Sequence, residues 1–396
     1  MTTSKRLLPP RRASTVLVVG SMGLVLAVLP SFLVGGLAVQ VREELALGEA
    51  ALGGAVAIGF LAGALAAVLL GRLADWLGPR KAIVIGGTLS VISLFALGLF
   101  VSDWVTLVIV LCMAGVGTAV IDPGLAVLVS RALPRHEHGT AFGIKEASVP
   151  TATLLAGLAV PTIALTVGWR WAFVLGVVPV VTLAFLLPRL GMGAEVQEAV
   201  DISAERGVTG SRRRSLFLVA LASALGSAAA SGIGVFLTES GVAMGLSPGG
   251  AGYLLATGSI AGILTRIGTG IYADRDGGEQ LGLISWMLLL GAITMALASV
   301  GSTPLLVLGA IGTFAGGWGW TGLLFLSLVR AGPRSPGTFA GFGTAGLGVG
   351  NALGPLAFGV LAQTASFRTA WLTAAVAAAA ASVVMRMARR GLGSVE

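Results

Sequence analysis

Long apolar runs separated by short polar turns make up most of this chain. A helix needs about 20 apolar residues to cross the hydrocarbon core of a bilayer, and twelve runs of roughly that length can be marked off. The pattern predicts an all-α membrane protein with twelve transmembrane helices. The runs lie near residues 15–40, 50–71, 82–101, 104–130, 139–166, 170–189, 215–239, 248–272, 280–300, 303–330, 336–363 and 367–387.

One extended polar segment interrupts the series at 191–214, where several acidic residues precede three consecutive arginines. It divides the chain into an N-terminal half at 1–190 and a C-terminal half at 215–396, each with six predicted helices. Because six crossings return the chain to the side where it started, both halves enter the membrane in the same sense. We therefore expect two parallel six-helix repeats joined by a cytoplasmic loop.

The two halves also share residues when they are compared at an offset of about 200. Asp75 then pairs with Asp274, and Arg131 pairs with Arg330. This correspondence indicates an internal duplication, and parallel repeats of this kind favour a central cavity between the halves.

The composition fits a bilayer rather than water as the solvent. Hydrophobic residues are 56% of the 396 and charged residues only 11%, whereas soluble domains average about 25% charged residues. The first apolar run lacks the cleavage site of a secretory signal, so we expect it to be a retained span. The excess of arginine over lysine and the abundance of Gly and Ala favour a bacterial chain, and hence the bacterial plasma (inner) membrane.

A net charge of +8 could indicate a nucleic-acid partner, but topology explains it first. Most of the 25 Lys and Arg residues fall on turns at the same side as the N-terminus. The positive-inside rule then places both termini in the cytoplasm. We therefore expect the lipid bilayer, and no nucleic acid, as the large partner of this chain.

The turn between the second and third predicted helices, from Gly71 to Lys81, follows the pattern Gly-x-x-x-Asp-x-x-Gly-x-Arg-Lys, and a degraded copy begins at Gly270. With the six-plus-six helices and the long middle loop, this motif resembles the major facilitator superfamily. The sequence Gly-Trp-Arg-Trp-Ala-Phe, which begins at Gly168, is also similar to bacterial members. The resemblance covers almost the whole chain and implies a secondary transporter that works by alternating access without a cofactor.

The resemblance further implies that this turn belongs to a cytoplasmic gate. Asp75 would accept hydrogen bonds at a neighbouring helix N-terminus or pair with Arg131, and we expect its replacement to impair transport more than replacement of Asp274. The chain departs from the family pattern at Trp76 and Leu111, where arginines are usual, and it lacks the Gly-Pro-x-x-Gly-Gly pattern linked to drug export. The gate candidates are Gly71, Asp75, Gly78, Arg80, Arg131, Asp274 and Arg275.

Three ionisable residues fall inside predicted spans: Asp122, Lys145 and Glu146. Each costs about 2.5–3.5 kcal/mol at a bilayer centre, so such residues are usually paired or functional. A rise of 1.5 Å per residue places them at similar depth, which allows an ion pair between Asp122 and Lys145. Because adjacent helical residues diverge by about 100°, we expect that Lys145 and Glu146 do not face one point.

Three roles remain open for these charges. A carboxylate in low-dielectric surroundings can exchange a proton near neutral pH, as a proton-coupled carrier requires. Lys145 could instead attract an anionic substrate, or the group could be an interior latch.

Small polar and aromatic residues mark the expected wall of a central cavity, with close helix packing as the alternative. Prolines and glycines in the fifth and eleventh predicted helices are expected to bend or gate these helices. The cavity candidates are Ser31, Ser227, Ser231, Trp318, Trp320 and Thr321, and the bending candidates are Pro150, Pro161, Gly354 and Pro355.

We therefore expect a monomeric secondary active transporter that moves a small organic solute with protons. The alternatives are an uncoupled facilitator and a membrane sensor or interaction protein on the same fold. An enzyme is not expected. The pair His136 and His138 lacks further nearby metal ligands, and no Gly-x-x-x-x-Gly-Lys-Ser/Thr phosphate loop is present.

Overall fold

The computed structural model describes residues 10–178, 210–276, 279–332 and 336–392. Regular structure in these ranges is entirely helical, and nine of the described helices are long and apolar enough to cross a membrane. The expected all-α membrane protein is confirmed at this level. The elements are α1 Pro10–Gly36, α2 Ala38–Leu45, α3 Glu49–Leu99, α4 Trp104–Ala132, η1 Arg135–Glu137, α5 His138–Glu146, α6 Ser148–Ala159, η2 Val160–Ala164, α7 Trp169–Leu175, α9 Gly210–Ala243, α10 Pro248–Asp276, α11 Gln280–Ala298, α12 Thr303–Gly312, η5 Thr313–Gly317, α13 Thr321–Ala331, α14 Pro336–Thr364 and α15 Phe367–Leu392.

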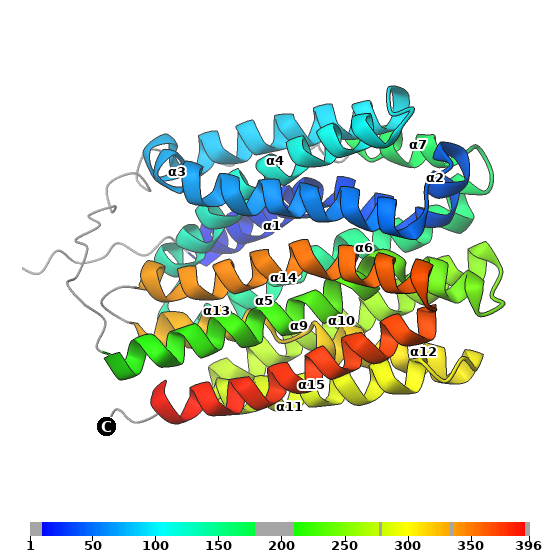
Figure 1. Cartoon of the computed structure of the whole chain (residues 1–396). Helices are drawn as coiled ribbons and strands as arrows, with labels where there is room; N and C mark the ends of the chain where they lie inside the picture. The colour runs from blue at the N-terminus through cyan, green and yellow to red at the C-terminus, as the bar shows by residue number, and fades with distance from the viewer. Residues whose placement is uncertain (1–9, 179–209, 277–278, 333–335, 393–396) are drawn as a thin grey trace, which may run out of the picture.

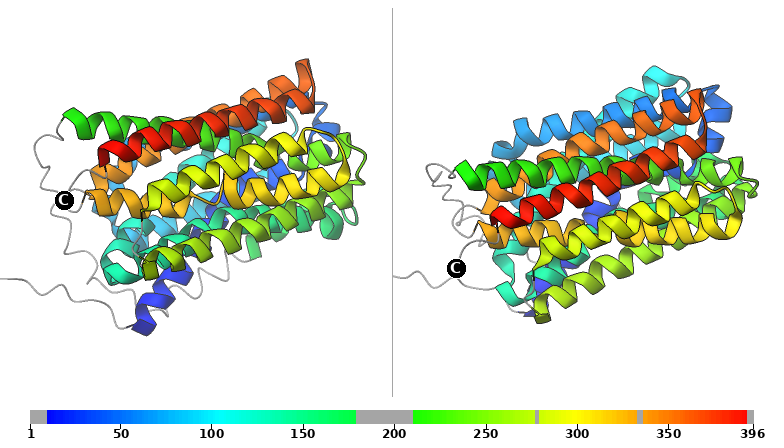
Figure 2. Two further views of the ribbon diagram at one scale, coloured as in Figure 1. Left: turned by 90° about the horizontal axis from the view of Figure 1, so that it is seen from below. Right: turned by 60° about the horizontal axis from the view of Figure 1, so that its bottom comes forward.

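The long helices run side by side along one axis, in two groups (Figures 1 and 2). One group contains α1, α3 and α4, and the other contains α9, α11, α14 and α15. The first described helix begins and the last one ends at the same end of the bundle, which we call the terminal end. The opposite end carries α2 and is called the α2 end.

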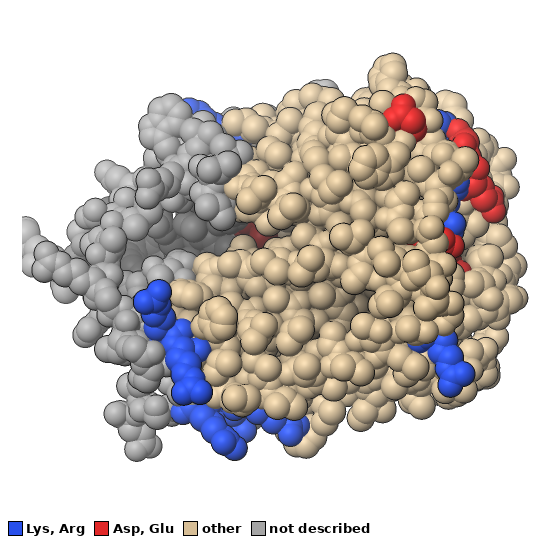
Figure 3. All heavy atoms as spheres, viewed as in Figure 1, with Lys and Arg blue, Asp and Glu red and all other residues tan. Residues whose placement is uncertain are grey.

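Charged side chains avoid the middle of the bundle surface. On the face drawn in Figure 3 they gather near the two ends, and a broad band between them carries almost none. Large apolar side chains such as Leu264, Trp286 and Val376 are exposed instead. Exposed apolar surface of this extent requires a hydrocarbon solvent, because a soluble protein rarely exposes large contiguous apolar patches.

Helix α3 contains two of the predicted spans and the turn between them. It is helical throughout its 51 residues, yet it reverses direction at the terminal end (Figure 1). Its first limb packs Gly63 against Gly115 of α4, and its second limb packs Gly86 against Gly117 of the same helix. The expected non-helical turn at 71–81 is therefore helical, although the two expected crossings lie on either side of it.

Two predicted spans are interrupted rather than continuous. The span predicted at 139–166 consists of α5, α6 and the π-helical segment η2, and the span predicted at 303–330 consists of α12, the π-helical segment η5 and α13. Helix α9 begins at Gly210, five residues before the predicted start at 215, so the predicted loop is shorter at this end. Most of the predicted sixth span lies outside the described residues.

The two halves meet closely at the α2 end. Gly53 of α3 lies against the Pro355 carbonyl of α14, and Gly35 of α1 lies against the backbone of Val235 in α9. The Thr238 hydroxyl donates to the Gly35 carbonyl at 3.2 Å. Small residues allow these backbones to approach, so van der Waals contact closes this end.

We expect Gly53→Ala to destabilise the protein. Its Cβ would collide with the Pro355 carbonyl, and such overpacking typically costs about 1–3 kcal/mol. The neighbouring Gly54→Ala is the matched control, because its Cβ would meet only the Leu356 side chain, at 3.8 Å. Thermal unfolding in detergent should show a lower midpoint for Gly53→Ala and an unchanged or higher midpoint for Gly54→Ala. Equal midpoints would contradict this packing.

Candidate functional site

Three ionisable side chains meet inside the bundle. The Lys145 Nζ lies 2.6 Å from Oδ1 of Asp122 and 2.7 Å from Oε1 of Glu146. The side chains of Lys145 and Glu146 are 1% and 10% exposed, whereas that of Asp122 is 32% exposed, so Asp122 is the most exposed of the three. The structure thus forms the ion pair between α4 and α5 that the spacing allowed.

The expectation that Lys145 and Glu146 diverge is wrong. Helix α5 ends at Glu146, and the long lysine side chain places its ammonium group between the two carboxylates. The Phe325 ring of α13 lies 4.8 Å from the Lys145 Nζ, and Phe142 stacks on that ring. The cation is therefore held by two carboxylates and one aromatic face.

Arg266 of α10 is a fourth charged member, and sequence reasoning missed it. The positive-inside rule would place an arginine near the end of an apolar run in the cytoplasm, but the Arg266 side chain is 1% exposed within a candidate span. The Arg266 Nε donates to the Thr321 hydroxyl at 3.2 Å, and NH2 donates to the Trp318 carbonyl at 2.9 Å. Thr321 and Arg266 both lie close enough to Glu146 to act electrostatically on its carboxylate. The signal available in the sequence was its position inside the apolar run predicted at 248–272, six residues before the end of that run.

The irregular backbone between α12 and α13 explains why a carbonyl is free at this depth. The π-helical segment Thr313–Gly317 is followed by Trp318, Gly319 and Trp320 before α13 begins at Thr321. A break in the helical hydrogen-bond ladder leaves a carbonyl available to another donor, and π-helical segments are frequent at functional sites. Arg266 takes the Trp318 carbonyl in this way.

These contacts form one charge-balanced network, defined here as Asp122, Lys145, Glu146, Thr321 and Arg266. Two negative and two positive groups alternate along it. Its first three members belong to the N-terminal half, and the other two belong to the C-terminal half. Buried charges are tolerated when each is paired, so changing one charge disturbs the group as a whole.

The six cavity candidates are all buried. Trp320 packs against Gly226 and donates to the Gly317 carbonyl at 2.8 Å, while Ser227 donates to the Leu347 carbonyl at 3.2 Å, so these two hold helices together. Trp318 and Thr321 contact Arg266 instead. The buried candidates are Ser31, Ser227, Ser231, Trp318, Trp320 and Thr321.

At the terminal end, Asp274 of α10 caps the start of α5. Its Oδ1 accepts from the Gly139 N–H and its Oδ2 accepts from the Thr140 N–H, both at 2.7 Å. Arg330 lies 4.0 Å from the same carboxylate, and Gly270 lies against Gly139. The contact expected for Asp75 at a helix N-terminus is thus present at its repeat partner, where it joins the two halves.

The remaining gate candidates fall largely outside the part of the chain whose side chains are described. Their gate role stays a prediction. These residues are Gly71, Asp75, Gly78, Arg80 and Arg131, whereas Arg275 is described and exposed.

A second ionic contact joins the halves at the α2 end. Arg42 of α2 pairs with Glu239 of α9, and its NH2 lies 3.0 Å from Oε1 of Glu49 in α3. Glu239 is 5% exposed, and its Oε2 has no hydrogen-bond partner. Together with the glycine contacts, this ion pair seals the α2 end.

Three of the four residues expected to bend helices, Pro150, Pro161 and Pro355, are contact points between the halves. Pro161 opens the π-helical segment η2 and packs against Gly252 of α10, and the Pro355 carbonyl meets Gly53. Pro150 lies against Gly262, and Gly354 lies against the Ala228 carbonyl within the C-terminal half. A role in bending or gating remains a prediction for Pro150, Pro161, Gly354 and Pro355.

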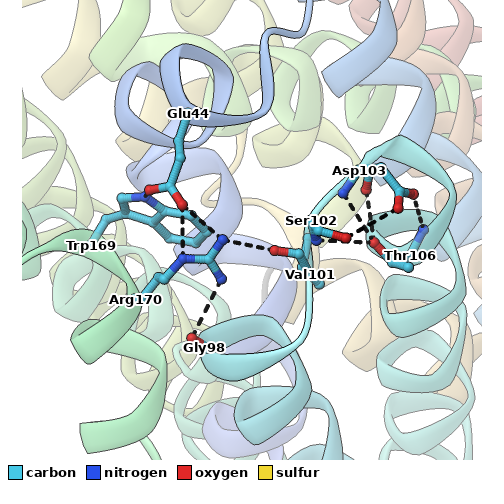
Figure 4. Close-up of polar contacts among 8 residues, drawn as sticks. All are labelled: Glu44, Gly98, Val101, Ser102, Asp103, Thr106, Trp169 and Arg170. Atoms are coloured by element: carbon cyan, nitrogen blue, oxygen red, sulfur yellow. Dashed lines mark hydrogen bonds and ion pairs between the residues drawn. The ribbon is translucent and has the colours of Figure 1, made fainter.

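A polar cluster at the α2 end anchors α7 (Figure 4). Glu44 of α2 accepts from Arg170 Nε at 2.9 Å and from the Trp169 indole, and Arg170 NH2 donates to the Val101 carbonyl at 2.8 Å. Burial raises the pKa of Glu44, but the hydrogen bonds from Arg170 and Trp169 outweigh it and hold the pKa below its ordinary value of 4.5.

The network is not part of a metal-ligand group among the described side chains, nor of the surface pocket between α10, α11 and α13. Among the described side chains, no group of three or more His, Cys, Asp or Glu could hold a metal ion. A surface pocket of about 350 Å³ lies between α10, α11 and α13, and it contains no member of the network. The network therefore remains the candidate site on the basis of its chemistry.

Comparison with known proteins agrees with this architecture. The family model described as "Major Facilitator Superfamily" matches residues 14–285. An uncharacterized MFS-type transporter of Mycobacterium tuberculosis is 28% identical over 155 residues, which are 38% of this chain and 26% of the relative. The matched region thus spans about a quarter of that relative.

Two solved structures share the fold. A bacterial homolog of the human lysosomal transporter Spinster, inward-facing and unoccupied, has a TM-score of 0.70 and 17% identity, covering 97% of this chain and 98% of its own. The human organic anion transporter MFSD10 has the same TM-score and identity, covering 95% of this chain and 100% of its own.

We expect Glu44→Gln to lower the thermal midpoint by about 1 °C at neutral pH, since a half-exposed ion pair contributes about 0–1 kcal/mol and unfolding of a chain of this length has a large entropy. The folded-state pKa is lowered, so this stabilisation is present above pH 4.5 and is lost as the pH falls through the folded-state value. Melting curves of wild type and variant should therefore converge in acid. The exposed neighbour Glu43 is the control, and an equal effect of Glu43→Gln at neutral pH would argue against the cluster.

Proposed function

Because this chain belongs to the major facilitator superfamily, we propose that it is a secondary transporter that couples protons to the movement of a small organic solute by alternating access. The observation that carries the proposal is the charge-balanced network, which contains groups from both halves. A carrier must link occupancy of its charged groups to the relative position of its halves. Because the network contains residues from both halves, a change in the charge of one residue can change which relative position of the halves is favoured.

The architecture we propose is twelve transmembrane helices in two parallel repeats, 1–190 and 215–396, with 191–214 as the cytoplasmic loop. The capping of α5 by Asp274 and its approach to Arg330 support the repeat, since Asp75 and Arg131 are their counterparts. We further propose a monomer in the bacterial plasma membrane, with both termini and the terminal end in the cytoplasm.

In this proposal the conformation described here faces the cytoplasm. Close contacts and the ion pair between Arg42 and Glu239 seal the α2 end, whereas Asp122 retains an exposed fraction of 32%. A proton from the cytoplasmic side reaches Asp122 first. Protonation removes one negative charge from the network, weakens the hold on Lys145 and changes the relative stability of the two conformations.

The gates follow from the same geometry. Asp274 at the start of α5 closes part of the terminal end, and it must release the two N–H groups when that end opens further. Gly71, Asp75, Gly78, Arg80 and Arg131 are proposed to form the corresponding contact in the N-terminal half, with Arg275 beside Asp274.

The test begins with a thermal-shift screen of purified protein against metabolites and drugs, because a ligand stabilises the protein that binds it. A solute found in this way is then followed in proteoliposomes with an imposed pH gradient. We expect gradient-driven flux in wild type. Asp122→Asn and Glu146→Gln should each lose this driven flux by at least about tenfold but retain solute exchange, which needs no net proton movement.

Arg386→Gln is the matched control, since Arg386 lies outside the network and hydrogen-bonds to Ser285 at 2.7 Å. It should retain both driven flux and exchange. Unchanged driven flux in both carboxylate variants would contradict proton coupling through the network. Absence of any flux for the bound solute would contradict transport itself.

A further inference from the structure

Arg266 has a donor group that the protein leaves unused. Its Nε and NH2 are hydrogen-bonded, but its NH1 is buried and has no hydrogen-bond partner. An unsatisfied buried donor usually costs about 1–3 kcal/mol, and more when it is charged. Such a group requires an explanation, and one explanation is an absent ligand that would accept from it.

The surroundings of Arg266 define what this ligand could be. A guanidinium group carries only donors and suits the two oxygens of a carboxylate. The Trp318 ring lies 5.6 Å from the Arg266 Cζ, and Phe32 and Phe314 lie beside that ring at 5.7 and 5.5 Å. Aromatic rings next to a cation favour an anion with an apolar body.

The charge balance of the network decides when such an anion can bind. With both carboxylates ionised, the two cations are compensated and an added anion would be in excess. Once Asp122 is protonated, Lys145 retains Glu146 as its only carboxylate partner. Glu146 is then drawn towards Lys145, and the charge of Arg266 is left uncompensated.

We propose that Arg266 binds the carboxylate of an organic monoanion and that a proton on Asp122 accompanies it, so the solute class is an organic acid moved together with one proton. The inference rests on the proposed function and specifies its substrate class. Proton and anion together restore a neutral network. By reciprocity, acid strengthens anion binding to the same extent that the anion strengthens proton binding.

Other ionisable groups around the two carboxylates do not provide this switch. Among the described side chains, Lys145 on α5 and Arg266 on α10 are the charged groups that face them, while α1 from Leu17 to Gly36 has no ionisable side chain. On α13, the charged residue Arg330 lies near Asp274 instead. His138 is the first residue of α5, seven residues before Lys145, and it contacts the Leu133 carbonyl and Phe142.

The test measures binding of three carboxylates, namely acetate, benzoate and octanoate, and of their neutral amides to the purified full chain by calorimetry. Binding is compared at about pH 6 and about pH 8, where the carboxylates stay ionised. At least one carboxylate should bind more tightly in acid, by up to about tenfold per pH unit, the limit for one proton per anion. Its amide should bind weakly and without pH dependence.

Three variants separate the steps. Asp122→Asn mimics the protonated residue, so it should bind the carboxylate at about pH 8 as tightly as wild type does at about pH 6. Arg266→Gln should weaken carboxylate binding at least tenfold, while Arg266→Lys should retain part of it. Arg386→Gln, the control outside the network, should behave like wild type.

Equal binding of acid and amide, no carboxylate binding at either pH, or pH-dependent binding that persists in Asp122→Asn would overturn the inference. At about pH 8, Asp122→Asn is expected to bind the carboxylate more tightly than wild type does. A folding defect would weaken binding, so it could not produce this result. The proposed function fails differently. If the carboxylate binds as expected but is not moved in proteoliposomes, the anion site is supported and transport is contradicted. If a neutral solute is moved by the pH gradient instead, transport is supported and only the anion site is contradicted.

Discussion

The balance of four charges inside the helix bundle, three of them buried, is the constraint on which the rest of this structure depends. Asp122, Lys145, Glu146 and Arg266 lie in a molecule whose surface is mostly apolar, and a single unpaired charge there would be costly. The two ion pairs of Lys145 and the hydrogen bonds of Arg266 make the group tolerable. Because the members come from both halves, this requirement for charge balance also constrains how the halves sit against each other.

Close packing through glycine provides the second constraint. At the α2 end, Gly53 and Gly35 allow the halves to touch through their backbones, and at the terminal end Gly139 and Gly270 do the same. Such contacts hold few side chains in fixed rotamers, so they can separate without breaking an interdigitated core. Directional contacts join the halves at the same two ends, where Asp274 holds α5 and Arg42 holds Glu239.

Much of the fold could be predicted from the sequence because apolar runs of about 20 residues are a strong signal. The predicted runs near 248–272, 280–300 and 336–363 agree closely with α10, α11 and α14. The helical turn within α3 was missed, because glycine, proline and charge indicate a break without showing how tightly the chain turns. The π-helical segments were also missed, since no periodic pattern marks them.

The candidate site was predictable only in part. Asp122, Lys145 and Glu146 stand out because they interrupt apolar runs, but their geometry depends on the end of α5 and on the reach of the lysine side chain. Arg266 lies near the end of a run, where an arginine is normally explained by topology, so its burial could not be read from position alone. Similarly, Asp274 and Asp75 are equivalent by sequence, and only the structure shows the contact of Asp274 with α5.

If the four charges act as one unit across the two halves, Asp122 and Arg266 are energetically coupled, and a double-mutant cycle between these two residues measures the coupling. These residues connect only through Lys145, Glu146 and Thr321, and independent sites normally add within about 0.3–0.5 kcal/mol. Thermal or denaturant unfolding at neutral pH is measured for wild type, Asp122→Asn, Arg266→Gln and the double variant. Since the double variant restores charge balance, we predict that it is more stable than the sum of the single changes by about 1 kcal/mol or more. Additive losses would contradict the account.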